Sequence, residues 1–310
     1  MEDQITPIVS FAICTHNRAF IINKCLQSIL EQKSANFIFE VLIIDNNSTD
    51  NTKKTVQPYV KQNPNFRYIF EEKIGLSHAR NRAIEEARGE WIIYIDDDAI
   101  LDGNYFEELE KTIVNYDFDC FGGPYYPWYP YGKPKWLPHD FGLKQPIINT
   151  TGYISGNDGF LSGGNFVIKK DVANEIGGFN SEFGMKGRGI AYGEEDELQQ
   201  RLLKQGKKIG FNPKLSILHA VLKDKLQIRW HLKSNFKRGQ TREALFPLSR
   251  NVLFPIFEFF RSLIGALIKR VPKSIIQFFC SQNYYIQNVF LDIFSPLAFY
   301  LGAVSFHLKK

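Results

Sequence analysis

Short apolar runs alternate with helical patterns through the first hundred residues of the chain. Three runs are typical of buried strands, which are short and uniformly apolar; they cover Ile8–Cys14, Phe39–Ile44 and Trp91–Ile95. Apolar residues at helical spacing lie between these runs and predict helices over Ile21–Ile29, Thr52–Val60 and Leu76–Arg88. The alternation predicts an α/β fold with a mainly parallel sheet and helices on its faces.

Polar residues close each apolar run. Thr15–Arg18 follow the first run, Asp45–Asp50 follow the second and Asp96–Asp98 follow the third. Within the second group, Ser48 or Thr49 is expected to cap the next helix. Ligands of open α/β sheets bind outside the carboxyl ends of the strands. The three strand ends therefore predict a single ligand site.

The three adjacent carboxylates after Ile95 are the most specific of these signals. On an extended chain Asp96 and Asp98 point to one side and Asp97 to the other. A carboxylate pair of this kind could hold Mg²⁺ or Mn²⁺, which prefer oxygen ligands. The alternative is a solvated turn in which Asp98 or Asp102 caps a helix that begins near Tyr105. Polar groups at the two other strand ends favour the metal site.

The order of four segments carries a resemblance to a known family. They are TxNR at Thr15–Arg18, IIDNNSTD at Ile43–Asp50, IGLSHARNRAI at Ile74–Ile84 and GEWIIYIDDD at Gly89–Asp98. This order resembles family 2 glycosyltransferases, which are inverting enzymes with a Rossmann-like nucleotide-sugar domain called the GT-A fold. The resemblance covers residues 5–220 and continues through Leu161–Val172, Gly177–Phe179, Gly193–Gly206 and Ile217–His219.

The resemblance implies a nucleotide-sugar site at the strand ends. Asp45 matches the acid that hydrogen-bonds the nucleotide base, commonly the N–H of uracil, and a carboxylate only accepts. Arg80 matches a cation near the diphosphate, for which a guanidinium is well suited; the alternative for Arg80 and Arg82 is a solvated helix face. The residues that match the nucleotide-sugar pocket are Thr15, Asn17, Arg18, Asp45, Arg80, Asp96 and Asp97.

The same resemblance implies a metal site. Asp96 and Asp98 match the family's DxD pair, with Asp98 as the direct ligand and Asp96 facing ribose or metal. His219 ends the apolar run Leu215–Leu218, where the family often places a histidine near the diphosphate or metal. Neutral imidazole can ligate Mn²⁺, although a lone histidine after a strand can also be structural. We expect Mn²⁺ or Mg²⁺ on Asp98, Asp96 and His219.

Four consecutive acids, Glu194–Glu197, precede Leu198 and Arg201. The helix dipole favours acids in a first turn, but four exceed that need. The family pattern E-D-x-D/E-L-x-x-R, aligned on Leu198 and Arg201, implies that Glu195 is the catalytic base, where many members carry Asp. Asp196 takes that place if the register slips by one. The base would take the proton of an acceptor hydroxyl that attacks the anomeric carbon.

Two further segments offer sugar contacts. Gly164 and Asn165, after Leu161, either let the backbone approach the donor sugar or acceptor, or form a tight turn only. Residues 121–160 are rich in proline, which forbids regular helix or central strand, and in aromatic residues, which argue against disorder. Trp128 and Trp136 are expected to contact sugar there, in a lid that binds the acceptor. Packing onto the core or a membrane is the alternative.

Charge and hydropathy divide the chain near residue 220. Val221–Lys310 has 14 lysines and arginines against 4 acids, a balance of +10, so the rest carries −5 of the total +5. Residues 221–250 are expected to form a basic linker or lid, in which Arg238-Gly239 matches a family segment that reaches the diphosphate. No nucleic-acid partner is expected, because no recognised binding module accompanies the basic residues.

Residues 251–310 form an apolar tail. Its runs, Val252–Ile268 and Ile286–Leu308, are interrupted by charges and a proline, whereas a membrane span needs about 20 nearly uncharged residues. We expect interfacial helices on a membrane surface. A re-entrant hairpin, true spans, or a helical subdomain packed on the core or on a second subunit are the alternatives.

The four cysteines are isolated, which favours a reducing compartment, and the polar start Met1–Thr6 predicts no secretory signal. We therefore expect a cytoplasmic protein, peripheral on the inner face of the cell membrane.

The expected function follows from these parts. It is an inverting, metal-dependent glycosyltransferase of hexosyltransferase type, with a GT-A-like domain over residues 1–220. It would move sugar from a nucleoside diphosphate donor, UDP-sugar favoured, to a saccharide or lipid-linked acceptor in polysaccharide or glycolipid biosynthesis. A nucleotidyltransferase is disfavoured because Thr15–Arg18 contains no glycine for a phosphate loop. A non-catalytic sugar-nucleotide-binding protein at the membrane would lack Glu195.

Overall fold

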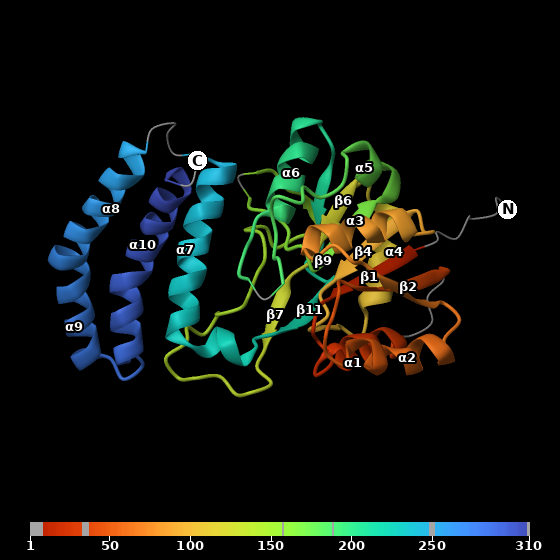
Figure 1. The fold of residues 1–310 in the computed structure, drawn as a ribbon, viewed down its shortest axis with the longest axis horizontal. Coiled ribbons are helices and arrows are strands. Elements are labelled where there is room, and N and C mark those ends of the chain that lie inside the picture. The colour runs from red at the N-terminus through yellow and green to blue at the C-terminus, as the bar shows by residue number, and fades with distance from the viewer. Residues whose placement is uncertain (1–8, 33–36, 157, 188, 248–251, 309–310) are drawn as a thin grey trace. The chain divides into compact units, whose positions relative to one another are not determined.

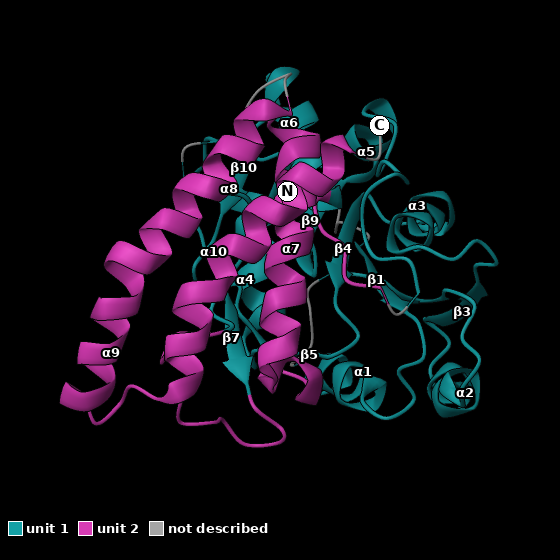
Figure 2. Cartoon of the chain, turned by 60° about the vertical axis from the view of Figure 1, so that its left-hand side comes forward, with its two compact units in different colours: residues 1–128, 142–187, 194–220 teal, residues 129–141, 188–193, 221–310 magenta. Residues whose placement is uncertain are grey.

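The structure, a computed structural model, describes residues 9–32, 37–156, 158–187, 189–247 and 252–308. Ile8 of the first predicted strand and the polar start Met1–Thr6 lie outside the described residues. The chain divides into two compact units (Figure 2). The sheet unit comprises residues 1–128, 142–187 and 194–220, and the helical unit comprises residues 129–141, 188–193 and 221–310.

An eight-stranded mixed sheet forms the centre of the sheet unit, in the order β3-β2-β1-β4-β9-β6-β10-β8. Its first four strands are parallel to one another; they are β1 (Val9–Thr15), β2 (Phe39–Asp45), β3 (Phe66–Phe70) and β4 (Trp91–Ile95). The other four are β9 (Asn165–Lys169), β6 (Cys120–Gly122), β10 (Ile209–Phe211) and β8 (Gly152–Tyr153). The predicted α/β class and the three predicted strands are confirmed.

Helices cover both faces of this sheet (Figure 1). One face packs on α1 (Ile22–Leu30), α2 (Thr52–Gln62) and α4 (Tyr105–Asn115), and the other on α3 (Leu76–Glu86), α5 (Lys170–Glu175) and α6 (Glu194–Lys204). The strands supply both cores because successive side chains point to opposite faces. In β4, Trp91 and Ile93 join one core while Ile92 and Tyr94 join the other.

The start of α2 differs from the prediction. The helix begins at Thr52, whose N–H donates to Oδ1 of Asp50 at 2.8 Å. Ser48 instead accepts from the backbone N–H of Asn17 at 2.9 Å. The expectation that Ser48 or Thr49 caps this helix is wrong, because the chain turns for two further residues and brings a carboxylate to the first turn.

A three-stranded sheet, in the order β5-β11-β7, adjoins the strand ends. It contains β5 (Ala99–Leu101), β11 (Ile217–Ala220) and β7 (Tyr125–Trp128). The sequence did not predict β7, which contains Pro127. The strand is tolerated because it lies at the edge, where a missing N–H costs no ladder hydrogen bond.

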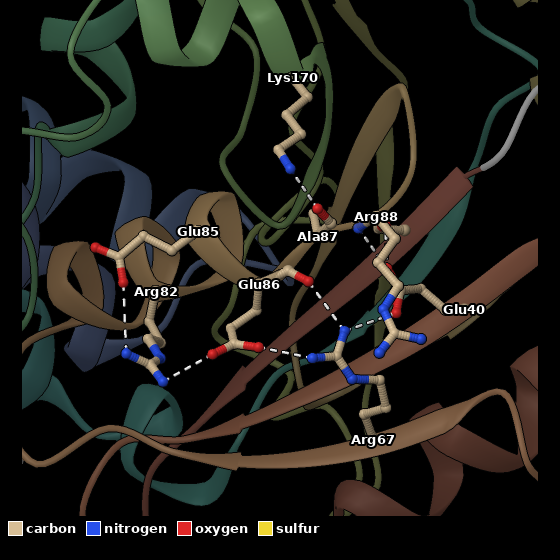
Figure 3. Close-up of polar contacts among 9 residues, drawn as sticks. Glu40, Arg67, Arg82, Glu85, Glu86, Ala87, Arg88 and Lys170 are labelled. Carbon is tan, nitrogen blue, oxygen red and sulfur yellow. Dashed lines mark hydrogen bonds and ion pairs between the residues drawn. The ribbon is translucent and has the colours of Figure 1, made fainter.

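A polar network joins β2, β3 and α3 near the start of β2, at the opposite end of this strand from Asp45 (Figure 3). Arg67 donates to Glu40 Oε2 at 2.9 Å and to Glu86 Oε2 at 2.6 Å. Glu86 also accepts from Arg82 at 2.7 Å. Glu40 is buried and also accepts from the hydroxyl of Ser10. Because these groups satisfy one another, the network holds the strand starts and α3 together.

The helical unit contains four helices among its described residues, after a 3-10 turn η1 (Lys223–Leu226). They are α7 (Ile228–Leu245), α8 (Leu253–Gly265), α9 (Val271–Cys280) and α10 (Ile286–His307), and a π-helical turn, η2 (Ala266–Arg270), joins α8 to α9. Helices α7 and α10 lie side by side in both views (Figures 1 and 2). Of the described helices, α10 is the one long and apolar enough to cross a membrane.

Candidate functional site

The loops after β1 and β2 are tied to one another. Asn17 adopts a left-handed backbone with φ of 55°, which asparagine tolerates better than most residues. Its side-chain oxygen accepts from the N–H groups of Thr49 at 2.8 Å and Asp50 at 3.1 Å. Arg18 adds a bond from its N–H to the hydroxyl of Thr52 at 3.0 Å. Asn17 and Arg18, which were predicted at the edge of the nucleotide pocket, thus hold the loop after β1 against the loop after β2.

Asp45 lies at the end of β2, opposite Thr15 on β1. Its Oδ1 accepts the N–H of Ser48 at 2.9 Å, and its Oδ2 accepts the hydroxyl of Tyr68 at 2.8 Å. Burial and the neighbouring Asp45 carboxylate raise the pKa of Tyr68, which therefore remains a donor. The sequence analysis missed Tyr68, because only pairing of β3 with β2 brings it to Asp45.

The three acids after β4 separate into two groups. Asp97 is buried, and its Oδ1 lies 3.5 Å from Nε of Arg18 in the loop after β1. Burial raises the pKa of Asp97 to about 7, although Arg18 opposes the rise. Asp96 and Asp98 turn instead toward His219, so the alternation expected from an extended chain is present.

Asp96, Asp98 and His219 form a compact cluster. Their ligand atoms all lie within 4.8 Å of one another. Nε2 of His219 is 3.2 Å from Oδ1 of Asp98 and 3.5 Å from Oδ2 of Asp96. Burial alone would raise the pKa of Asp96, but His219 and Arg80 hold it below its ordinary value. The cluster therefore offers two carboxylates and an imidazole to one divalent cation.

Tyr125 and Gly164 fix the position of Asp96. The Tyr125 hydroxyl donates to Oδ2 of Asp96 at 3.3 Å and accepts the N–H of Gly164 at 2.5 Å. The carbonyl of Gly164 accepts the N–H of Asp96 at 3.1 Å. A Cβ at position 164 would collide with the Asp96 carboxylate. Gly164 is thus required beside the acid. Tyr125, one of the aromatic residues of the segment 121–160, was not predicted as a site residue.

The prediction for Asn165 concerned its backbone and stays a prediction, whereas its side chain has a structural role. Its side chain is fully buried, accepts the hydroxyl of Tyr105 at 2.7 Å and donates to the carbonyl of Leu215 at 2.7 Å. Because both polar atoms are engaged and covered, the side chain does not face a sugar site. Asn165 instead connects α4 with the segment that leads into β11.

Arg80 is buried, so its interpretation as part of a solvated helix face is wrong. Its Nη1 donates to Oε1 of Glu194 at 2.9 Å, and its guanidinium lies 5.1 Å from the ring centre of Phe179. A Cβ at Gly163 would lie 2.6 Å from Nη2. Burial disfavours the charged form, but the carboxylates of Glu194, Glu195 and Asp96 raise the pKa of Arg80. Arg80 therefore remains charged, and it lies between the start of α6 and the cluster of Asp96, Asp98 and His219.

Glu194 and Glu195 begin α6, where the helix dipole stabilises negative charge. Burial and the adjacent Glu195 raise the pKa of Glu194 to about 8, against the effect of Arg80. Each of the two carboxyl groups has one buried oxygen that hydrogen-bonds to none of the described residues. Two acids in one environment disfavour each other's ionisation, which is why the pKa of Glu194 is raised although Arg80 lies beside it. Asp196 lies in the same first turn.

The two tryptophans proposed for one lid belong to different units. Trp128 lies on β7 in the sheet unit, where Nζ of Lys24 is 5.3 Å from its ring centre. Trp136 belongs to the helical unit, with its ring 5.3 Å from that of His231. The predicted segment 121–160 is therefore divided between the two units, and its role in binding the acceptor stays a prediction.

A sequence model of the family described as Glycosyl transferase family 2 matches residues 10–177, more than half of the chain. EpsH of Bacillus subtilis, named as a glycosyltransferase, is 35% identical over 107 residues, which are 34% of this chain and 30% of EpsH. A glucosyl-dolichyl phosphate glucuronosyltransferase of Haloferax volcanii is 23% identical over 252 residues, covering 76% of this chain and 77% of the relative.

Among solved structures, the mannosyltransferase PcManGT from Pyrobaculum calidifontis, in complex with GDP-Man and Mn²⁺, has a TM-score of 0.65. It is 16% identical, and the match covers 99% of this chain and 89% of PcManGT. This likeness supports the GT-A fold that the sequence predicted. The family match extends from β1 to the end of α5 and includes Asp45, Arg80 and the three acids after β4. The chain belongs to glycosyltransferase family 2.

Proposed function

We propose that this chain transfers a sugar from a nucleoside diphosphate donor to an acceptor hydroxyl, with inversion and with the help of a divalent cation. One arrangement carries the proposal. The buried guanidinium of Arg80 contacts Glu194, and the charges of Asp96 and Glu195 also act on it. The cluster suited to a cation and the acids suited to a base are therefore neighbours.

Asp96, Asp98 and His219 fit a divalent cation. Two ligand atoms about 2.1 Å from one ion are about 3 Å apart in octahedral geometry, and His219 Nε2 lies 3.2 Å from Asp98 Oδ1. Carboxylates suit both Mg²⁺ and Mn²⁺, and the imidazole favours Mn²⁺. When bound, such an ion would neutralise charge on the departing diphosphate. The presence of Mn²⁺ in the structure of PcManGT supports this reading.

Glu195 is our candidate for the base, with Asp196 as the alternative in the same turn. An inverting displacement needs one group that takes the proton of the acceptor hydroxyl as the new bond forms. Glu195 offers a buried carboxylate oxygen that no described residue hydrogen-bonds. The carboxyl group of Glu194 is engaged by Arg80 at 2.9 Å, so Glu195 is the member of the pair that is left for the acceptor.

Asp45 supports a uracil base in the donor. Its two oxygens are oriented by Ser48 and Tyr68, and each retains a lone pair for a further donor. The imide N–H of uracil is such a donor. Guanine also offers N–H groups, and PcManGT was solved with GDP-Man, so the choice between UDP and GDP requires a direct comparison.

We further propose that the acceptor is lipid-linked or part of a growing polysaccharide, and that the enzyme works peripherally on the cytoplasmic face of a membrane. The name of the Haloferax relative includes a dolichyl phosphate. The helical unit exposes large apolar side chains, among them Phe257, Phe279 and Phe290. These side chains fit a lipid surface better than water.

Thermal unfolding with UDP, GDP, UDP-sugars and GDP-sugars, each with and without Mn²⁺, tests the donor site. A ligand that binds the folded chain raises its melting temperature in proportion to occupancy. We expect a rise with UDP compounds that requires Mn²⁺ and is lost in Asp98→Ala. A folded protein that responds to no nucleotide would contradict the proposal. Release of pyrophosphate in place of a nucleoside diphosphate during turnover would identify a nucleotidyltransferase.

A further inference from the structure

A cavity of about 400 Å³ lies within the helical unit, and Trp136, which was expected above to contact sugar, is among the residues that line it. One wall is the segment Lys133–His139, and the other is formed by Asn283, in the turn between α9 and α10, and by Asn288 at the start of α10. The sequence analysis grouped the first wall with a sugar-binding lid and the second with the apolar tail. The structure joins them.

The chemistry of this cavity suits an anion. Lys133, Lys135 and His139 bring cationic or donor groups, and Asn283 adds an amide. None of the described residues that line it is acidic. The nearest acid of the first turns of α10, Asp292, accepts the hydroxyl of Tyr284 at 2.5 Å. Phosphate oxygens are strong acceptors that pair with lysine and with amide N–H groups.

The two walls are held together without a ligand. Asn288 donates from its amide to the carbonyl of Trp136 at 2.7 Å and accepts the N–H of Tyr285 at 2.8 Å. Lys133 donates to the carbonyl of His139 at 2.8 Å, which closes the first wall on itself. The cavity is thus built before an anion arrives, which lowers the ordering cost of binding.

Exposed apolar side chains flank the cavity residue Asn283 in the sequence, at the end of α9 and at the start of α10. Phe279, the residue before the end of α9, is 80% exposed, and Ile286, the first residue of α10, is 61% exposed. Further along, the rings of Phe290 and Phe294 contact each other at a tilt of 36°, and each side chain is more than two fifths exposed. A ligand with a phosphate in the cavity and a hydrocarbon chain on this surface would match both chemistries.

The contact of α10 with α7 determines the depth at which this surface meets a bilayer. Gly302 packs against the backbone of Phe236, and Gly239 packs against the backbone of Phe299, so closely that a Cβ at either glycine would collide. Helix α7 carries Arg229, Lys233, Lys237, Arg238 and Arg242. If α10 crossed the bilayer, it would either carry the cations of α7 into the hydrocarbon or separate from α7. An interfacial position, at the level of lipid phosphates, would keep the two helices together.

We propose that the cavity binds the phosphate of an anionic bilayer phospholipid, with Lys133 and Lys135 as its cations and the exposed residues of α9 and α10 against the acyl chains. The inference rests on the proposed membrane location of the enzyme and adds the lipid chemistry that it recognises.

The test is co-sedimentation of the full chain with vesicles of phosphatidylcholine, alone or mixed with phosphatidylglycerol. It is run at about 1 M salt, where the Debye length is about 3 Å and diffuse attraction is screened. We expect Lys133→Gln/Lys135→Gln to lower the partition coefficient on phosphatidylglycerol vesicles at least tenfold. The matched control, Lys269→Gln/Lys273→Gln, removes two exposed lysines of the same unit outside the cavity and should change it less than twofold.

Three outcomes would overturn the proposal. Equal losses in both variants would indicate general surface charge, and no loss in either would show that the cavity does not contact lipid. Full competition by millimolar inorganic phosphate would identify a free-anion site. The Mn²⁺-dependent response to UDP, measured on the same variants without vesicles, keeps this result separate from the donor site. That response should be unchanged, because neither lysine pair belongs to the sheet unit.

Discussion

Arg80 and Glu194 form a buried ion pair, with Nη1 2.9 Å from Oε1 and with 4% and 6% of the two side chains exposed. The pair joins the middle of the sheet unit to the first residue of α6, 114 positions later in the chain. Its position between Asp96 and Glu195 makes it the structural link between the two halves of the proposed site.

Breaking this pair on one side should destabilise the fold strongly. At pH 9, above the pKa of Glu194, Arg80→Met leaves a buried carboxylate without its cation, which typically costs about 3–5 kcal/mol. The double variant Arg80→Met/Glu194→Gln should recover more than half of that loss, since no charge is left unpaired. Urea denaturation of the wild type, both single variants and the double variant gives the coupling energy. Additive losses would show that the two side chains do not depend on each other.

Gly164→Ala should disable the site without an exchange of any polar group. The new methyl group would have to displace the Asp96 carboxylate, and overpacking of this kind costs about 1–3 kcal/mol. The Mn²⁺-dependent response to a nucleotide should be lost. Gly152→Ala is the control, because a Cβ there meets no atom within 4 Å and its stability change should stay within about 0.5 kcal/mol. Retained nucleotide binding in Gly164→Ala would exclude the proposed role of Asp96.

Substitution of the two candidate bases separates them. Glu195→Gln should lower kcat by about 10²–10⁴-fold, the range of a positioned general base, while the thermal response to donor and metal is kept. Asp196→Asn should change kcat less than tenfold. The reverse order of effects would assign the base to Asp196, and equal small effects would remove both from the mechanism.

The raised pKa of Glu194 predicts a pH-dependent stability. Because the folded chain binds this proton more tightly than the unfolded chain, the stabilisation is complete below pH 4.5 and is lost as pH rises through about 8. Glu194→Gln resembles the protonated form and lacks this dependence. Between pH 6 and pH 9 the wild type should lose about 1 kcal/mol or more relative to the variant. Parallel curves would mean that Glu194 titrates normally. Asp97 has the same sign of effect and cancels in the comparison.

Several parts of the site could be predicted because they are local. The period of two along a strand separates Asp97 from Asp96 and Asp98, and the apolar runs locate β1, β2 and β4. The partners of these acids could not be predicted in the same way. Tyr68 reaches Asp45 through the pairing of β3 with β2, and Tyr125 reaches Asp96 through an edge strand that contains proline.

The interpretation of Arg80 shows the limit most clearly. The spacing along its own helix does not separate a core position from a surface position, and its burial depends on Glu194, Phe179 and Gly163 in distant segments. The same limit applies to the tail. The apolar pattern predicted helices there, but the tight crossing of α7 and α10 depends on backbone contacts at two glycines in separate segments.

That crossing has a practical consequence for handling the protein. Deletion of the apolar C-terminus is a common way to obtain a protein that stays in solution. Here the deletion would remove Gly302 of α10, which packs against the backbone of α7. It would also uncover the carboxyl group of Glu243, which is buried and lies 3.0 Å from Nε2 of His307. A shortened chain would therefore lose order in its middle as well as at its end. The whole 310-residue chain is therefore the form on which the measurements above should be made.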